Sequence, residues 1–416
     1  MPSLADQAAI GQTSRSLCLS RFFPIASFDG QFWKFFIASL FFDLGMFVFA
    51  FLYNLYLLDR GLTEKTMGWI AGAVSLGTML ATIPAGVLTR KIGLKNSLLS
   101  CFVAIPLLSA FRALVPGNVM LVLLALIAGG VFAVWAVSLP PTVASLTNER
   151  NRSVGFSLIF ALGIGSGIIG GYVGGHLPSW CSSLRNGSPA ELKQLSLLLS
   201  CLIVLAGVLP CRRLVIENAA PASTATRLRA SNYLWRFLPP IAAWSFGLGV
   251  VSPFLSVYLT KNLHLDLPQV GSMFSLSQFL QMVSVLAAPH IFRRWGTLPT
   301  VTLSQVATSI SLFGFASVLL GPWMLLSFSA YSLFQYMNEP GVYTLLMNNV
   351  SPEEQSSAAA WNFFVICAAQ GVAALISGNL IARVGYSVVL SSAAVLMAVS
   401  GVALYFAVRQ REPLLR

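Results

Sequence analysis

The sequence predicts an all-α integral membrane protein with twelve transmembrane helices, arranged as two pseudo-symmetric six-helix bundles around a central cavity. Hydrophobic residues make up 56% of the 416 residues and charged residues only 9%, which would leave a soluble domain insoluble. Twelve apolar stretches approach the roughly 20 residues that cross a hydrocarbon core. One sequence pattern also occurs twice, about half the chain length apart, as in membrane proteins built from two copied halves.

The repeated pattern is an apolar stretch of helix length that runs into two adjacent cations and then a glycine. The first copy runs from Gly68 to Gly93 and closes in PAGVLTRKIGLK; the second runs from Gly271 to Gly296 and closes in APHIFRRWG. The cations are Arg90 and Lys91 in the first copy, and Arg293 and Arg294 in the second. Each copy predicts a membrane helix, a tight basic turn and a further membrane helix.

The predicted spans are bounded by charges, glycines and prolines, which mark helix ends. In the first half they are 35–58, 67–89, 96–115, 119–142, 154–176 and 194–210, and in the second half 235–259, 269–292, 298–318, 322–348, 357–382 and 386–408.

The domain organisation follows from these spans and from one long polar segment inside the chain. That segment contains ENAAPASTATRLRAS and is rich in Ala, Ser and Thr, as linkers are. The predicted parts are an N-terminal cytoplasmic tail (1–34), a six-helix bundle (35–210), a cytoplasmic linker (211–234), a second six-helix bundle (235–408) and a C-terminal cytoplasmic tail (409–416).

The net charge of +12 reflects membrane topology rather than nucleic-acid binding. Most Lys and Arg residues fall in loops, tails or helix ends on the side that holds both termini, which predicts both termini in the cytoplasm of a cell (inner or plasma) membrane. The six cysteines have no paired spacing, so neither a disulfide framework nor a metal site is expected. No phosphate-cradling G-x-x-x-x-G-K-[ST] loop is present, so no cofactor is expected and an ion gradient should supply the energy.

With these features, the chain resembles the major facilitator superfamily over nearly its whole length. The loop after the second span matches the family's motif at Gly86, Leu88, Lys91, Gly93 and Lys95, but a cation, Arg90, replaces the family's acid. The second copy repeats this replacement at Arg293. The resemblance implies alternating-access transport of a small molecule, with the first, fourth, seventh and tenth helices lining the cavity.

A substitute for the family's acidic latch is predicted from the loops after the fourth and tenth spans, TNERNRS and SPEEQSS. We expect Arg90 to pair with Glu149, and Arg293 with Glu353 or Glu354, closing the cytoplasmic side of the outward-facing state. The alternative is that these are ordinary solvated charges, whose pairing contributes about 0–1 kcal/mol.

Two carboxyl groups, Asp43 and Glu339, lie inside predicted spans, where a charge costs roughly 2.5–3.5 kcal/mol. Asp43 shares a helix face with Asn54. Glu339 precedes Pro340, which removes a helical hydrogen bond and predicts a bend beside the acid. Both are candidates for proton coupling or substrate binding; the alternative is a structural role.

Other polar and aromatic residues at helical spacing are candidate cavity positions, although each aromatic residue could equally be packing. They are Asn54, Trp135, Trp244, Gln278, Gln281, Gln335, Tyr343, Trp361 and Asn362.

The function expected from these features is proton-coupled export of small lipophilic or cationic compounds, with Asp43 and Glu339 exchanging protons for substrate. The alternatives are proton-driven uptake of a sugar, amino acid or small metabolite, and a transport-inactive membrane receptor. The expected partners are a small-molecule substrate, protons and the lipid bilayer, with no nucleic acid, no enzymatic activity and a monomeric state.

Overall fold

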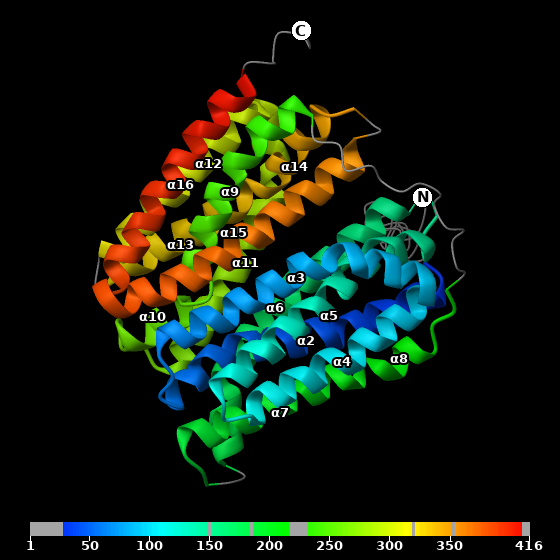
Figure 1. Ribbon diagram of the computed structural model, residues 1–416, viewed down its shortest axis with the longest axis vertical. Coiled ribbons are helices and arrows are strands. Elements are labelled where there is room, and N and C mark those ends of the chain that lie inside the picture. Colours follow the sequence, from blue (N-terminus) through cyan, green and yellow to red (C-terminus); the bar gives the residue numbers. More distant parts are fainter. Residues whose placement is uncertain are drawn as a thin grey trace, which may run out of the picture.

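The computed structural model describes residues 28–148, 151–183, 186–216, 231–317, 321–351 and 354–409, and every regular element in these ranges is a helix. Within them, eleven helices are long and apolar enough to cross a membrane. The remaining predicted span, 322–348, is present as two shorter helices end to end. The prediction of an all-helical, two-bundle membrane protein is therefore confirmed (Figure 1).

The helices fall into an N half and a C half. The N half comprises α2 (Gly30–Asp59), α3 (Glu64–Ile92), α4 (Leu94–Leu114), α5 (Asn118–Ser145), α6 (Arg152–Ser182), α7 (Pro189–Ala206) and α8 (Val208–Arg212). The C half comprises α9 (Asn232–Val251), α10 (Leu255–Lys261), α11 (Leu267–Trp295), α12 (Thr297–Ser317), α13 (Pro322–Met337), α14 (Glu339–Asn348), α15 (Gln355–Val384) and α16 (Tyr386–Arg409).

Two predicted spans differ from the observed helices for local reasons. The span predicted at 235–259 is not continuous, because the chain turns at residues 252–254, where Pro253 has no N–H to donate, and resumes as α10. The span predicted at 194–210 begins earlier, at Pro189. There the Ser188 hydroxyl and the Glu191 carboxylate form a capping box that starts α7.

The repeated basic turn adopts the same backbone in both halves. Helices α3 and α11 end at Gly93 and Gly296, whose φ angles are 82° and 84°, and the next helix starts at once. These left-handed conformations favour glycine over any residue with a side chain. Two adjacent cations occupy the last turn of each helix, where they also complement the helix dipole.

The two ends of the molecule differ in their charged residues. The basic end carries Arg90 and Lys91 of α3 with Arg293 and Arg294 of α11. The Glu64 end lies at the other end of these helices, where Glu64 begins α3. In Figure 1 the N half and the C half lie side by side along α3 and α15.

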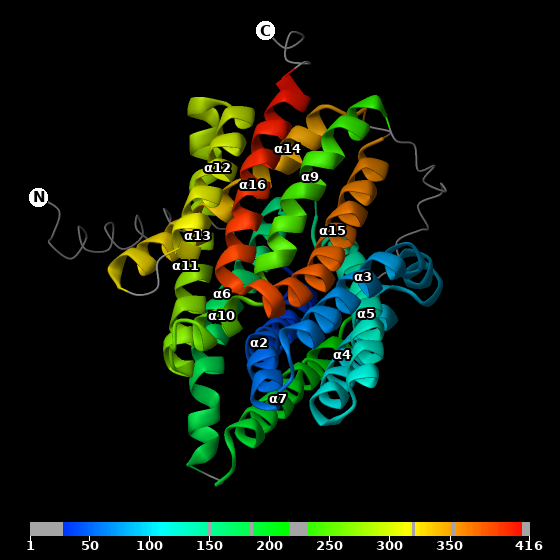
Figure 2. The same ribbon diagram turned by 60° about the vertical axis from the view of Figure 1, so that its left-hand side comes forward.

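The halves meet along two helix pairs, α3 with α15 and α6 with α11, seen at opposite edges of the molecule in Figure 2. Small residues line both seams. A Cβ atom added to Gly271 of α11 would lie 2.6 Å from the Gly171 carbonyl oxygen and 2.8 Å from Gly175 Cα of α6. In the other seam a Cβ on Gly68 would lie 3.1 Å from Gly378 Cα. The backbones can come this close only because side chains are absent.

Buried apolar residues show where the halves are packed together. One cluster contains residues of both halves, including Leu52 and Met67 from the N half and Phe254 and Leu259 from the C half. Two further clusters lie toward the basic end, and each belongs to one half only. The described structure is therefore closed at the Glu64 end, and its two halves have separate cores at the basic end.

Replacing Gly271 by Ala should destabilise this arrangement. The added methyl group collides with backbone atoms of α6, which cannot rotate away, so we expect a loss of about 1–3 kcal/mol and a lower thermal unfolding midpoint in detergent. Gly165→Ala on α6 is the matched control, because nothing lies within 4 Å of its Cβ position. Equal midpoints for the two variants would contradict the close seam.

Candidate functional site

The tenth span is interrupted at the residue before Glu339. Helix α13 ends at Met337, Asn338 is buried, and Glu339 is the first residue of α14. The Asn338 side-chain amide donates to the Gln335 carbonyl at 2.6 Å, which satisfies one backbone acceptor freed by the break. The helix is thus interrupted directly before Glu339, at the place where the bend is predicted.

The Glu339 side chain is exposed although it lies in the middle of a predicted span. Tyr343, one turn later on α14, is 44% exposed, and Gln335, one turn earlier, is half-buried. A charged group that faced lipid at this depth would be costly, whereas one that faces water or a polar ligand is not. The geometry therefore favours an aqueous space beside α14.

Asp43 is half-buried on α2 and faces α6. A Cβ atom added to Gly163 of α6 would lie 3.8 Å from Asp43 Oδ2. The missing side chain of Gly163 thus leaves room next to the carboxyl group. Asp43 and Glu339 belong to opposite halves and do not touch each other, so a ligand or water would have to connect them.

The remaining candidate positions separate into distinct environments. Trp135 is only 6% exposed and stacks on Phe42, with ring centroids 4.2 Å apart, inside the aromatic core of the N half. Trp244 is likewise buried, in the cluster shared by the two halves. These two tryptophans occupy packing positions rather than a cavity wall.

Two polar candidates bridge the halves. The Asn54 amide of α2 donates to the Pro253 carbonyl at 2.6 Å, at the break between α9 and α10. Gln278 of α11 packs against α6, because a Cβ on Gly167 would lie 2.9 Å from its Cδ atom. Gln281, one turn further along α11, is half-buried. Asn54 and Gln278 thus both contact the opposite half.

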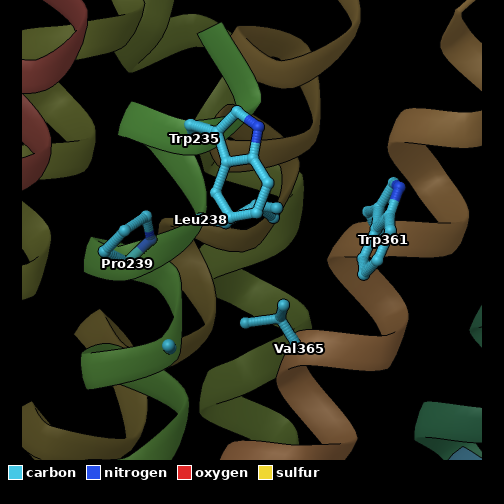
Figure 3. A pocket seen from close by; sticks show the side chains of 6 residues that line it. Trp235, Leu238, Pro239, Trp361 and Val365 are labelled. Carbon is cyan, nitrogen blue, oxygen red and sulfur yellow. The ribbon is translucent and has the colours of Figure 1, made fainter. Parts of the chain in front are cut away.

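An apolar pocket of about 250 Å³ lies between α9 and α15 in the C half. Trp235, Leu238 and Pro239 of α9 lie opposite Trp361 and Val365 of α15 (Figure 3). Leu238, Trp361 and Val365 pack in the same cluster as Val342 of α14, one turn after Glu339. The pocket and α14 are therefore connected through one apolar cluster.

Asn362, the neighbour of Trp361, is 1% exposed, and neither its side-chain nitrogen nor its oxygen has a hydrogen-bond partner among the described residues. An amide left in this state costs free energy. It is a polar group buried beside the pocket wall.

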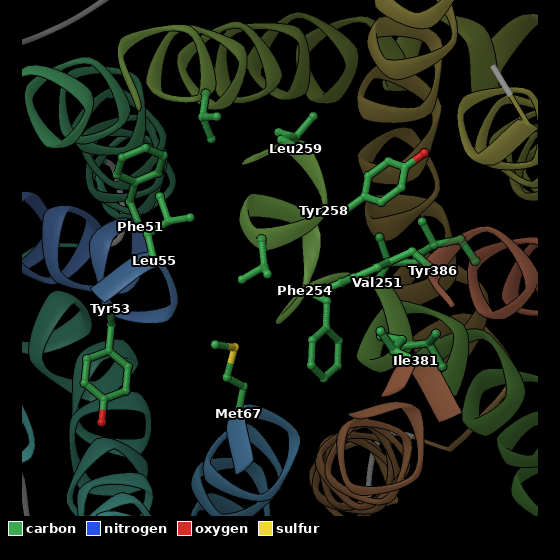
Figure 4. Packing of buried hydrophobic residues seen from close by; sticks show 14 of the residues in the cluster. Phe51, Tyr53, Leu55, Met67, Val251, Phe254, Tyr258, Leu259, Ile381 and Tyr386 are labelled. Atoms are coloured by element: carbon green, nitrogen blue, oxygen red, sulfur yellow. The ribbon is translucent and has the colours of Figure 1, made fainter. Parts of the chain in front are cut away.

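The Glu64 end is closed by apolar packing and by one ion pair between the halves. Figure 4 shows Phe51, Leu55 and Met67 of the N half facing Val251, Phe254 and Leu259 of the C half. At the rim, Lys261 Nζ of α10 lies 2.5 Å from Glu64 Oε1, and the Tyr386 hydroxyl of α16 donates to the same oxygen at 3.3 Å.

The sequence predictions did not include this group of Glu64, Lys261 and Tyr386. Each residue stands at a helix end, where a charged or aromatic residue is common at a membrane interface. The only local signal was that an acid opens α3 while a cation closes α10, on the same side of the membrane.

The predicted pairs at the basic end lie partly outside the described residues, which include neither Glu149 nor Glu353; Glu354 is described and forms no ion pair with Arg293 in this state. Arg90, Lys91, Arg293 and Arg294 are exposed, and none of the described residues forms an ion pair with them. Gly86 lies inside α3, and Gly93 and Gly296 form the helix ends described above.

Comparisons with known proteins agree on one family. The sequence profile of the Major Facilitator Superfamily matches residues 35–374 and 245–415. A search of curated protein sequences finds no significant match.

Solved structures similar to this chain are transporters. The nucleoside transporter NupG has a TM-score of 0.75 at 14% identity, covering 92% of this chain and 99% of its own. A D-xylose-proton symporter has a TM-score of 0.69 at 16% identity, with 90% and 96% covered. An inward-facing, occupied bacterial homologue of the human lysosomal transporter Spinster has a TM-score of 0.68 at 13% identity, with 90% and 94% covered. At these identities the likeness shows a common fold.

A cysteine at position 343 should react quickly with a water-soluble maleimide, whereas one at position 254 should not. Tyr343 is exposed beside Glu339, and Phe254 is fully buried at the closed end; a buried thiol is inert. In a variant of the purified protein without native cysteines, we expect Tyr343→Cys to react at least about tenfold faster than Phe254→Cys. The reverse order would show that the Glu64 end is the open one.

Proposed function

Because the chain belongs to the Major Facilitator Superfamily, we propose that it is a secondary active transporter that exports small lipophilic or cationic compounds in exchange for protons. The single observation that carries this proposal is Glu339, an exposed acid at a helix break in the middle of a membrane span. A carboxyl group in this position can gain a proton on one side of the membrane and release it on the other.

Asp43 supplies a second carboxyl group, from the opposite half, with space beside it at Gly163. In alternating access the two halves move around a central site, so acids on both halves can follow the same ligand through the cycle. Substrate and proton then compete for Glu339 and Asp43, and this competition couples their movements.

The lipophilic character of the substrate is supported by the pocket between α9 and α15. Its six lining residues are apolar and include the indole rings of Trp235 and Trp361. Such a surface contributes by burying apolar area and by stacking. Cations are also attracted to indole faces, and Glu339 lies on α14, which contributes to the same apolar cluster as the pocket walls.

Proton-driven uptake of a polar solute is the second candidate. The observation that favours it is the similarity in fold to a nucleoside transporter and to a D-xylose-proton symporter. The same two acids would serve, with protons moving in the same direction as the solute. Hydrogen-bonding groups such as Gln281 and Gln335 would then contact the ligand.

For the opposite state we propose a latch at the basic end, in which Arg90 pairs with Glu149 and Arg293 with Glu353. All four cations of the basic turns are exposed in the described structure, which leaves them available when this end closes. With the basic end in the cytoplasm of a cell-membrane protein that acts as a monomer, these pairs would hold the outward-facing state.

Replacing Glu339 by Gln should abolish substrate-driven proton movement, because the amide cannot carry a proton. The measurement uses proteoliposomes with an internal pH dye, to which lipophilic cations, sugars and amino acids are added in turn. Entry of added substrate makes the lumen alkaline in antiport and acidic in symport. Asp266→Asn is the control: it removes a carboxylate that caps α11, and Asn is an equally good cap. Undiminished proton movement in Glu339→Gln would exclude Glu339 as the carrier.

Reversing Arg90 to Glu should impair transport, and reversing Glu149 to Arg as well should restore part of it. The reason is that two like charges at the latch prevent closure of the basic end. Combining Arg90→Glu with Glu353→Arg in the other half is the control and should not restore transport. If the first combination is as inactive as Arg90→Glu alone, the proposed pairing is wrong.

A further inference from the structure

We infer that Glu64 is a further proton-binding site of the transport cycle, at which protonation releases the closed Glu64 end. This goes beyond the proposed function, since it concerns a residue outside the cavity and does not depend on Asp43 or Glu339.

The Glu64 carboxylate makes its side-chain contacts across the boundary between the two halves. Glu64 belongs to the N half, and both of its side-chain partners, Lys261 and Tyr386, belong to the C half. A Cβ added to Gly378 of α15 would also meet Glu64 backbone atoms. Separating α3 from α10, α15 and α16 therefore removes all of these contacts together.

When this end is closed, the charge of Glu64 lies in a largely buried environment. The Glu64 side chain is only 9% exposed, whereas Lys261 is 52% exposed. A buried carboxylate is stable only with its counter-ion and hydrogen bonds. The closed state accordingly needs the ionised acid, which both Lys261 and Tyr386 stabilise as donors.

Proton binding to Glu64 is thermodynamically linked to opening of this end. Once the seam opens, the carboxylate faces water and can be protonated without losing an ion pair. The open state therefore binds the proton more tightly than the closed state, and by linkage a low pH at this end favours opening. A high pH favours closure.

The other ionisable groups near Glu64 do not reverse this sign. On its own helix, the Lys65 ammonium lies over the Trp69 ring, 5.2 Å from its centroid. On α15 the nearest cation is Arg383, which is exposed near the helix end. Like Lys261, both carry a positive charge, which favours the ionised carboxylate.

A second ion pair at the same end provides a matched control. Lys193 Nζ of α7 lies 2.7 Å from Asp59 Oδ2 of α2, so that pair is contained within the N half. Its contacts are not divided when the halves separate. Asp59→Asn should therefore leave the pH response of opening unchanged.

The experiment measures the distance between the halves by double electron–electron resonance on the full-length protein in lipid nanodiscs. Spin labels are placed on Gly117→Cys in the N half and Trp323→Cys in the C half, in a background without the six native cysteines. Neither position contacts Glu64, and no atom lies within 4 Å of the Cβ position at Gly117.

In the wild type we expect the population with the longer distance to rise by up to about tenfold from about pH 8 to about pH 3, the shift that one unit of linkage produces once the pH falls through the titration range of a carboxyl group. In Glu64→Gln this population should be the same at both pH values and larger than that of the wild type at pH 8. Lys261→Ala should also lose the rise at low pH, because without its counter-ion the buried carboxylate no longer favours the closed state; this keeps the test valid if Glu64→Gln does not fold.

Two outcomes would overturn the inference: a wild type whose distances do not change with pH, or a Glu64→Gln variant that keeps the wild-type response. Glu339→Gln separates this inference from the proposed function. If the distance response survives in Glu339→Gln, Glu64 acts independently. Failure of proton transport through Glu339 would then leave the inference intact.

Discussion

The close approach of helix backbones between the two halves is the constraint on which the structure depends. In a membrane, water does not drive helices together, so association relies on van der Waals packing and on hydrogen bonds between helices. Glycines at both seams allow this contact, and the Ser275 hydroxyl adds a hydrogen bond of 2.8 Å to the Ile168 carbonyl of the other half. The shared apolar core and the Glu64–Lys261 pair at the same end require these seams to be closed.

Most of the fold could be predicted from hydropathy and from the duplicated pattern, because span length and charge placement are set by the bilayer itself. The break before Glu339 followed from Pro340. The break at Pro253 did not, and proline alone does not decide it: Pro239 and Pro240 lie inside a continuous α9. At this break the Asn54 amide of the other half donates a hydrogen bond to the Pro253 carbonyl. A partner so distant in the chain cannot be recognised from the sequence.

The candidate site was less predictable. Helical spacing shows which residues share a face, but not whether that face meets open space or a neighbouring helix. Trp135 has the spacing of a cavity residue and is instead packed between Phe42 and Phe102. Conversely, Glu64 and Lys261 are 197 residues apart and stand at unremarkable helix ends, so only the folded chain reveals that they meet. Glu339 could be singled out because the free-energy cost of a charge inside a membrane is large and can be recognised from its position in the span alone.

The two copied halves are no longer mechanically equivalent. Helices α2 and α5 run without interruption for 30 and 28 residues, whereas their counterparts in the C half are each divided, at residues 252–254 and at Asn338. Among these four corresponding spans, the two interrupted ones therefore both belong to the C half. Each break is a place where a span of the C half can bend without disturbing the continuous α2 and α5, so flexibility and rigidity are assigned to different parts of the same chain.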